Sequence, residues 1–190
     1  MKKVFLSLTA AILFSIPSFA QLDISLMAGV NSTDFRCNPD EYLILNDWGY
    51  QGGVHVRIGK KTFFETGVQW LQSKTEFQST VDNIIYSDII SVSQLRIPAY
   101  LGKRIIKLGI VDLRVNTGPT MRIVSEVLDN DYHIHKEYFN EAVWSWDFGA
   151  GLDILVFSLD VNYELGLSEM ISGVSGTQND ILNITLGLTF

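Results

Sequence analysis

The chain has 190 residues, a formal net charge of −7 and 47% hydrophobic residues. Its length suits one domain, and an acidic chain without a basic cluster is a poor candidate for nucleic-acid binding. After residue 20 no segment is apolar for long enough to cross a membrane as a helix, and no stretch has a helical period. Two classes remain, a secreted β-domain and a β-barrel of an outer membrane.

The chain opens with the features of an export signal. Lys2 and Lys3 precede a mostly apolar run that ends at Ile16, and the small residues Ser18 and Ala20 stand before the expected cut. We therefore expect a signal peptide over residues 1–20 and a mature domain over residues 21–190. The alternative, an uncleaved membrane anchor, is disfavoured because the apolar run is short.

Apolar and polar residues alternate with a period of two, which predicts β-strands with two different faces. The expected strands cover residues 22–30, 48–59, 62–76, 90–104, 108–124, 141–154, 157–168 and 181–190. Tight turns are expected at 59–62, 105–107 and 155–156, and long polar loops at 31–47, 77–89, 125–140 and 169–180. Eight antiparallel strands with short turns at one rim and long loops at the other are typical of outer-membrane barrels.

The polar face of these strands favours a membrane barrel over a soluble sandwich. It is rich in Gly and in charges of both signs, with Arg in place of Lys, and Arg suits bidentate pairing with buried carboxylates. We therefore predict that this face lines the barrel interior and that the apolar face meets lipid; a solvated sheet face is the alternative. The expected lumen charge network consists of Arg57, Glu65, Arg96, Asp112, Arg114, Arg122, Asp147, Asp153, Asp160 and Glu164.

Aromatic residues are expected at both membrane interfaces. Phe63, Phe64, Phe157 and Phe190 stand near the short-turn ends of strands, and Trp48, Tyr50, Trp70 and Trp144 near the long-loop ends. Phe190, at the end of the chain, is also the expected signal for the barrel-assembly machinery. Pro98 and Pro119 lie inside strands, so each is expected at a bulge or at a local break in pairing.

Six motifs resemble successive strands of a known family. They are Tyr50–Gly59, Phe63–Trp70, Leu95–Lys103, Val115–Pro119, Asp147–Gly151 and Val161–Leu167. In order and spacing they are similar to the Bacteroidetes outer-membrane β-barrel group called PorT-like, over most of the mature chain. The resemblance implies an all-β, up-and-down barrel of eight antiparallel transmembrane strands in a bacterial outer membrane, with short periplasmic turns and long extracellular loops. It implies no single activity.

The sequence contains only weak candidates for a catalytic or metal-binding site. His133 and His135 are two residues apart beside Asp129 and Asp131, but a zinc site needs a further ligand. His55 is expected to be a hydrogen-bonding group that faces inward. The acids of the loops, Asp34, Asp40, Glu41, Asp129 and Asp131, show no calcium-loop pattern. Cys37 is the only cysteine, which excludes an internal disulfide. We expect no enzyme, no cofactor and no metal.

The expected function is a structural or interaction role through the extracellular loops, with an unidentified protein partner. An eight-stranded barrel encloses just enough space for its own side chains, which argues against a pore. A narrow solute pore and a barrel enzyme that acts at the outer rim remain the alternatives. The other expected partners are outer-membrane lipid and, during biogenesis, the barrel-assembly machinery.

Overall fold

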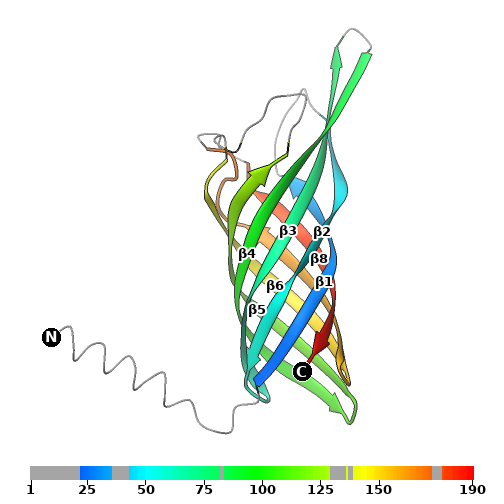
Figure 1. Cartoon of the computed structure of the whole chain (residues 1–190), viewed down its shortest axis with the longest axis vertical. Helices are drawn as coiled ribbons and strands as arrows, with labels where there is room; N and C mark the ends of the chain where they lie inside the picture. Colours follow the sequence, from blue (N-terminus) through cyan, green and yellow to red (C-terminus); the bar gives the residue numbers. More distant parts are fainter. Residues whose placement is uncertain (1–21, 36–42, 82–83, 129–135, 137–138, 173–176) are drawn as a thin grey trace, which may run out of the picture.

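The structure, a computed structural model, describes residues 22–35, 43–81, 84–128, 136, 139–172 and 177–190. The strands are β1 (Leu22–Phe35), β2 (Leu43–Ile58), β3 (Thr62–Val81), β4 (Ile84–Leu108), β5 (Val111–Val127), β6 (Ala142–Ile154), β7 (Phe157–Gly166) and β8 (Asn179–Thr189). Each strand pairs antiparallel with its neighbour in sequence, and β8 pairs with β1, so the sheet closes (Figure 1). This confirms the expected up-and-down barrel of eight strands. A helix suited to crossing a membrane is not found in the described part of the chain.

The two rims of the barrel differ. The short-turn rim, at the bottom of Figure 1, carries the tight turns β2–β3, β4–β5 and β6–β7, the start of β1 and the end of β8. Gly59, Gly109 and Leu155 take positive φ values of 126°, 63° and 55° in these turns. The opposite long-loop rim carries the connections that follow β1, β3, β5 and β7.

Three connections differ from the prediction. The loop expected at 31–47 is shorter, because β1 continues to Phe35 and β2 begins at Leu43. The turn expected at 105–107 lies at Gly109 and Ile110, because a bulge between Arg104 and Ile106 interrupts the alternation and β4 continues to Leu108. Residues 77–89, expected to be a loop, belong mostly to β3 and β4, whose hairpin rises above the rest of the barrel (Figure 1). The β-branched residues of this segment favour strand structure, and the polar residues between them concealed it.

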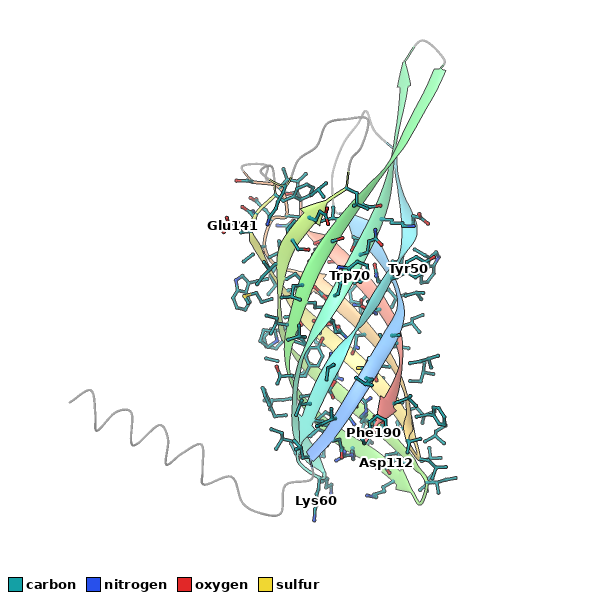
Figure 2. All side chains as sticks on the ribbon, in the orientation of Figure 1. Tyr50, Lys60, Trp70, Asp112, Glu141 and Phe190 are labelled. Carbon is teal, nitrogen blue, oxygen red and sulfur yellow. The ribbon has the colours of Figure 1, made fainter. Side chains whose placement is uncertain are left out.

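Burial follows the predicted faces. In β7 every second residue from Ser158 to Glu164 is buried, while Phe157, Leu159, Val161 and Tyr163 are exposed. The expected aromatic residues Trp48, Tyr50, Trp70, Trp144, Phe64, Phe157 and Phe190 all face outward. Figure 2 shows Tyr50 and Trp70 at the upper part of the barrel and Phe190 at the lower part, in agreement with two aromatic bands.

Phe63 was wrongly predicted to face the membrane. Its side chain is buried in the lumen, because it lies two residues before the inward Glu65 and therefore shares its face. The guanidinium carbons of Arg57 and Arg104 stand 5.1 and 5.5 Å from the centre of its ring. Phe63 thus forms a cation–π platform inside the barrel.

Pro98 and Pro119 lie at local breaks in pairing, one of the two arrangements expected. The β3–β4 ladder skips from the Thr66–Ala99 pair to the Gln69–Arg96 pair, with no shift of register. The β4–β5 ladder skips likewise beside Pro119. The Thr66 hydroxyl donates a hydrogen bond of 2.7 Å to the Pro98 carbonyl, which gives that carbonyl a partner within the gap.

Candidate functional site

The charged barrel interior is the candidate site, and its ion pairs form two layers. The upper layer, nearer the long-loop rim, consists of Arg96, Arg122, Asp147 and Glu164. The lower layer, nearer the short-turn rim, consists of Arg57, Arg114, Glu65, Asp153 and Asp160. Strand alternation points all of these side chains into the barrel interior.

Glu164 holds the two arginines of the upper layer together. The Nε atom of Arg96 lies 2.9 Å from one carboxylate oxygen of Glu164, and that of Arg122 lies 2.6 Å from the other. Arg96 also reaches Asp147 across 2.6 Å. All four side chains are at most 1% exposed. Two arginines and two carboxylates therefore pair in a setting without solvent, where a lone charge would cost several kcal/mol.

Neutral groups complete the upper layer. Arg96 donates to Gln69 Oε1 at 2.5 Å and to Tyr100 Oη at 2.6 Å. Ser145 donates to Glu164 at 2.5 Å. Arg122 donates to Gln94 at 3.2 Å and to Asn179 at 2.7 Å. The period of two places Gln69, Tyr100 and Ser145 on the inward face of their strands, but only the structure shows that they bond to the charged side chains.

In the lower layer Glu65 and Asp153 bridge the arginines. Glu65 accepts one hydrogen bond of 2.8 Å from Arg57, lies 3.9 Å from Arg114 and contacts His55 Nδ1 at 2.8 Å. Asp153 contacts Arg57 at 3.2 Å and Arg114 at 3.1 Å. Arg114 also reaches a carboxylate oxygen of Asp160 across 2.7 Å. The Asp153 side chain is 17% exposed, whereas the other four side chains are at most 3% exposed, so this layer meets solvent at Asp153.

Below it the charges continue to the short-turn rim through two residues that sequence reasoning missed. Arg104 contacts Asp23 at 2.6 Å and Asp112 at 3.7 Å. It also donates to the carbonyls of Gly59 and Lys60 in the β2–β3 turn. Asp112, one of the expected network residues, lies at this rim with its side chain 18% exposed. Asp23 stands between two apolar residues at the start of β1, a signal of inward parity.

Asparagines line the wall between the layers. Asn116 and Asn162 flank Gly149 on the neighbouring strands, and a side chain at Gly149 would collide with both amide oxygens. The Oδ1 atoms of Asn116 and Asn162, and both polar atoms of the Asn183 amide, are buried without a hydrogen-bond partner among the described residues. Buried polar atoms of this kind are ordinarily satisfied by internal water. Polar side chains rather than an apolar core therefore line the middle of the lumen.

An apolar plug lies above the upper layer. Val92, Val124 and Val143 face inward from β4, β5 and β6 and pack with Phe139 and Met170 from the connections at the long-loop rim. Phe139 pairs with Ile171 across the two connections, and Asn140 donates from its backbone to the Met170 carbonyl at 2.9 Å. Met170 in turn donates to the Thr177 carbonyl at 3.1 Å. The two connections thus form one small core against the inner faces of β4, β5 and β6.

The weak sites of the sequence analysis gain no support here. Within the described ranges, no three His, Cys, Asp or Glu residues are placed to hold a metal ion. Cys37, Asp40, Glu41, Asp129, Asp131, His133 and His135 lie outside the described residues. Asp34, the last residue but one of β1, is exposed and lies opposite Asp180. His55 faces inward as expected and contacts Glu65.

Comparisons with known proteins agree with this architecture. Residues 19–172 match the family model described as outer membrane protein beta-barrel domain. No curated protein sequence matches the chain.

Three solved structures are similar in fold. Ail, the attachment invasion locus protein of Yersinia pestis solved with the heparin analogue sucrose octasulfate, is 17% identical with a TM-score of 0.51, over 90% of this chain and 99% of that one. OprG of Pseudomonas aeruginosa is 12% identical with a TM-score of 0.54, over 88% and 95%. Neisserial surface protein A is 10% identical with a TM-score of 0.55, over 90% and 99%. At these identities the likeness concerns the fold alone.

Proposed function

Because the chain belongs to the outer membrane protein β-barrel domain family, a family of the bacterial outer membrane, we propose that it is a barrel with a closed interior that acts by binding at its long-loop rim. In this role the barrel anchors and spaces the loops, and the lumen transports nothing. The proposal separates the chain from the two alternatives, a solute pore and a barrel enzyme.

One observation carries the proposal: two barriers follow one another along the lumen. The upper layer brings side chains of β4, β5, β6 and β7 into contact, and the plug of Val92, Val124, Phe139, Val143 and Met170 lies above it. A solute would have to break buried ion pairs and then part an apolar core. An eight-stranded barrel has no spare width for a path around them.

The charges of the long-loop rim indicate the chemistry of a partner. The acids in or next to the connections at this rim are Asp34, Asp40, Glu41, Asp47, Glu76, Asp82, Asp88, Glu126, Asp129, Asp131, Glu137, Glu141, Glu169 and Asp180, against the bases Arg36, Lys74 and Lys136. Complementary charge speeds encounter and selects among partners. The proposed protein partner therefore presents a basic surface to the loops.

The proposal also covers the subgroup of the family, the removal of the signal peptide and the orientation of the loops. The chain is a PorT-like member, its residues 1–20 are removed on export, and the long loops face the cell exterior.

Phe190 is the assembly signal: its side chain is 73% exposed, and its backbone exchanges hydrogen bonds of 2.8 and 3.0 Å with Ile24 where the barrel closes. Deleting Phe190 should lower the inserted amount without affecting export, measured in outer-membrane fractions. Normal insertion of the variant without Phe190 would contradict its role as the assembly signal.

Planar-bilayer recording tests the closed interior. The purified protein, with folding verified by its heat-modifiable migration on a denaturing gel, should leave the membrane silent or flickering. Stable conductance steps of porin size from protein that passes the gel test would overturn the proposal and favour the pore.

A further inference from the structure

Lys103 is an unusual residue on the lipid-facing surface. It faces outward from β4 and is exposed, yet its neighbours on that surface, Leu101, Ile105 and Val115, are apolar. A lysine in this position extends its charged end to the membrane–water interface while its stem lies against apolar surface. Lys103 pairs with Thr62, the first residue of β3, so it stands close to the short-turn rim on the β3 side.

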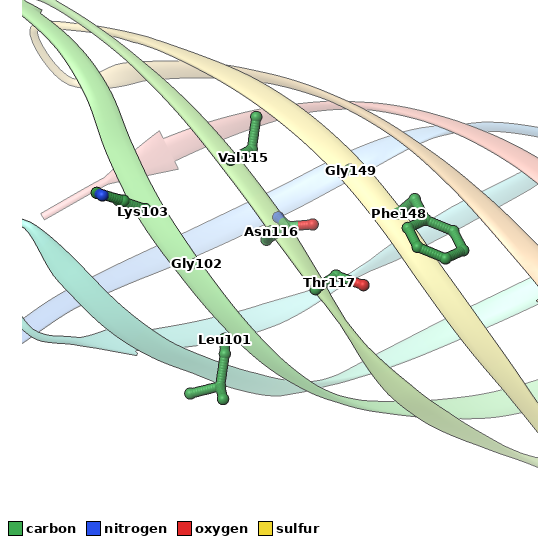
Figure 3. Close-up of a pocket in the computed structure, with 8 residues that line it drawn as sticks. All are labelled: Leu101, Gly102, Lys103, Val115, Asn116, Thr117, Phe148 and Gly149. Atoms are coloured by element: carbon green, nitrogen blue, oxygen red, sulfur yellow. The ribbon is translucent and has the colours of Figure 1, made fainter.

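A hollow in the outer wall adjoins Lys103. Figure 3 shows it between Leu101 and Lys103 of β4, Val115 and Thr117 of β5, and Phe148 of β6. Its floor is low because Thr117 stands between the longer Leu101 and Phe148, and Val115 stands between Lys103 and the short Ala150. The hollow therefore runs along the wall with a cation at one end.

The hollow presents almost no free polar group apart from Lys103. The Thr117 hydroxyl donates to the Asp147 carbonyl at 2.8 Å and accepts from the Trp146 indole at 2.8 Å. The lining is thus suited to a hydrocarbon chain, and the lysine to an anion.

Further lysines stand at the same rim. Lys60 and Lys61 are exposed in the β2–β3 turn, next to the Thr62–Lys103 pair. The Lys61 carbonyl accepts a 2.8 Å hydrogen bond from the Arg104 backbone, which ties the turn to β4 beside Lys103. Basic residues grouped at a membrane surface attract anionic headgroups.

We propose that this hollow is a binding site for an anionic glycerophospholipid of the leaflet at the short-turn rim. One acyl chain lies along Val115 and Thr117, between Leu101 and Phe148, and the phosphate meets Lys103. The inference rests on the membrane location in the proposed function and is independent of the closed interior.

A second hollow in the outer wall provides an internal control. It lies where β8 joins β1 and β7, and its lining residues are Leu26, Met27, Ala28, Phe157, Ser158, Leu186, Gly187 and Leu188. This lining is apolar and carries no charged side chain. It should accept acyl chains without preference for the headgroup.

Native mass spectrometry of the folded chain in detergent tests the site. The probe is an equal mixture of phosphatidylglycerol and phosphatidylcholine with identical acyl chains. The unaltered protein should retain phosphatidylglycerol preferentially. Lys103→Gln should lower that preference about fivefold, the fold-change that corresponds to about 1 kcal/mol for one lysine near a membrane surface. Lys103→Arg should retain it.

Substitutions that fill one hollow at a time distinguish the proposed site beside Lys103 from the second hollow. Val115→Phe should reduce retention of phosphatidylglycerol, whereas Ala28→Phe, which fills the second hollow, should leave the preference unchanged. Equal retention of both lipids by the unaltered protein, or an unchanged preference in Lys103→Gln, would overturn the site. Displacement of the lipid by millimolar inorganic phosphate would overturn it too, since the ligand would then be a free anion. None of these outcomes affects the conductance test.

Discussion

The two charged layers of the lumen use the same residue types in different settings. In the upper layer two arginines face two carboxylates, and all four side chains are at most 1% exposed. In the lower layer two arginines face three carboxylates, and the Asp153 side chain is 17% exposed. The charges balance in the fully buried upper layer. Carboxylates outnumber arginines in the lower layer, where the Asp153 side chain reaches solvent.

The difference follows from the cost of desolvation. A buried ion leaves water only if a partner of opposite charge and hydrogen bonds replace its hydration. The upper layer has both, with Gln69, Tyr100 and Ser145 adding neutral partners. The lower layer keeps contact with solvent, which screens its unbalanced charge. The upper layer therefore acts as the seal, and the lower layer is the inner end of a hydrated vestibule.

The largest expected effect is on conductance. With the plug weakened by Phe139→Ala, the further change of Arg96→Ala with Asp147→Ala removes one balanced pair from the upper layer and should turn a silent membrane into one with conductance steps. The matched control, Phe139→Ala with Arg114→Ala and Asp160→Ala, removes a balanced pair from the lower layer and should stay silent. Planar-bilayer recordings on both variants, each folded by the gel test, check this. If only the control conducts, the seal lies in the lower layer.

Glu164→Ala should cause the largest loss of stability. It leaves Arg96 and Arg122 buried without their shared carboxylate, which typically costs about 3–5 kcal/mol. Urea unfolding in lipid vesicles, followed by tryptophan fluorescence, measures the free energy of unfolding. A loss below about 1 kcal/mol, the range of exposed pairs, would mean that the upper layer is hydrated.

Asp153→Asn should cost less than Glu164→Ala although Asp153 also bridges two arginines. The Asp153 carboxylate is 17% exposed and keeps part of its hydration, so the cost should lie between the about 0–1 kcal/mol of exposed pairs and the about 3–5 kcal/mol of buried ones. The same unfolding measurement provides the comparison. Equal costs for the two variants would contradict the assignment of the lower layer to a hydrated vestibule.

The smallest expected effect is that of salt. At 1 M salt, charges in contact with solvent are screened beyond about 3 Å. The cost of Asp153→Asn should then fall by a few tenths of a kcal/mol, within the range of exposed pairs, while the cost of Glu164→Ala stays constant. Unfolding curves at low and high sodium chloride concentrations test the difference. The reverse dependence would exchange the roles of the two layers.

Local patterns in the sequence predicted the strands and their faces. A period of two assigns each residue to the lumen or to lipid, and inward positions such as Arg96, Asp147 and Glu164 were correctly placed. The pattern misled where its period was broken or hidden. The bulge at Arg104 moved one turn to Gly109, and polar residues concealed the β3–β4 hairpin.

The sequence by itself determined the class of the fold, the count of strands and the face of most residues, because alternation is a local property of the chain. Only the tertiary structure decided which charges meet. Arg96 and Glu164 are separated by 68 residues, and Arg104 and Asp23 by 81. Barrel closure tilts and staggers the strands, and this stagger sets the height of each side chain along the lumen. The pairing of the two layers and the plug above them therefore depends on the closed barrel, which no local period encodes.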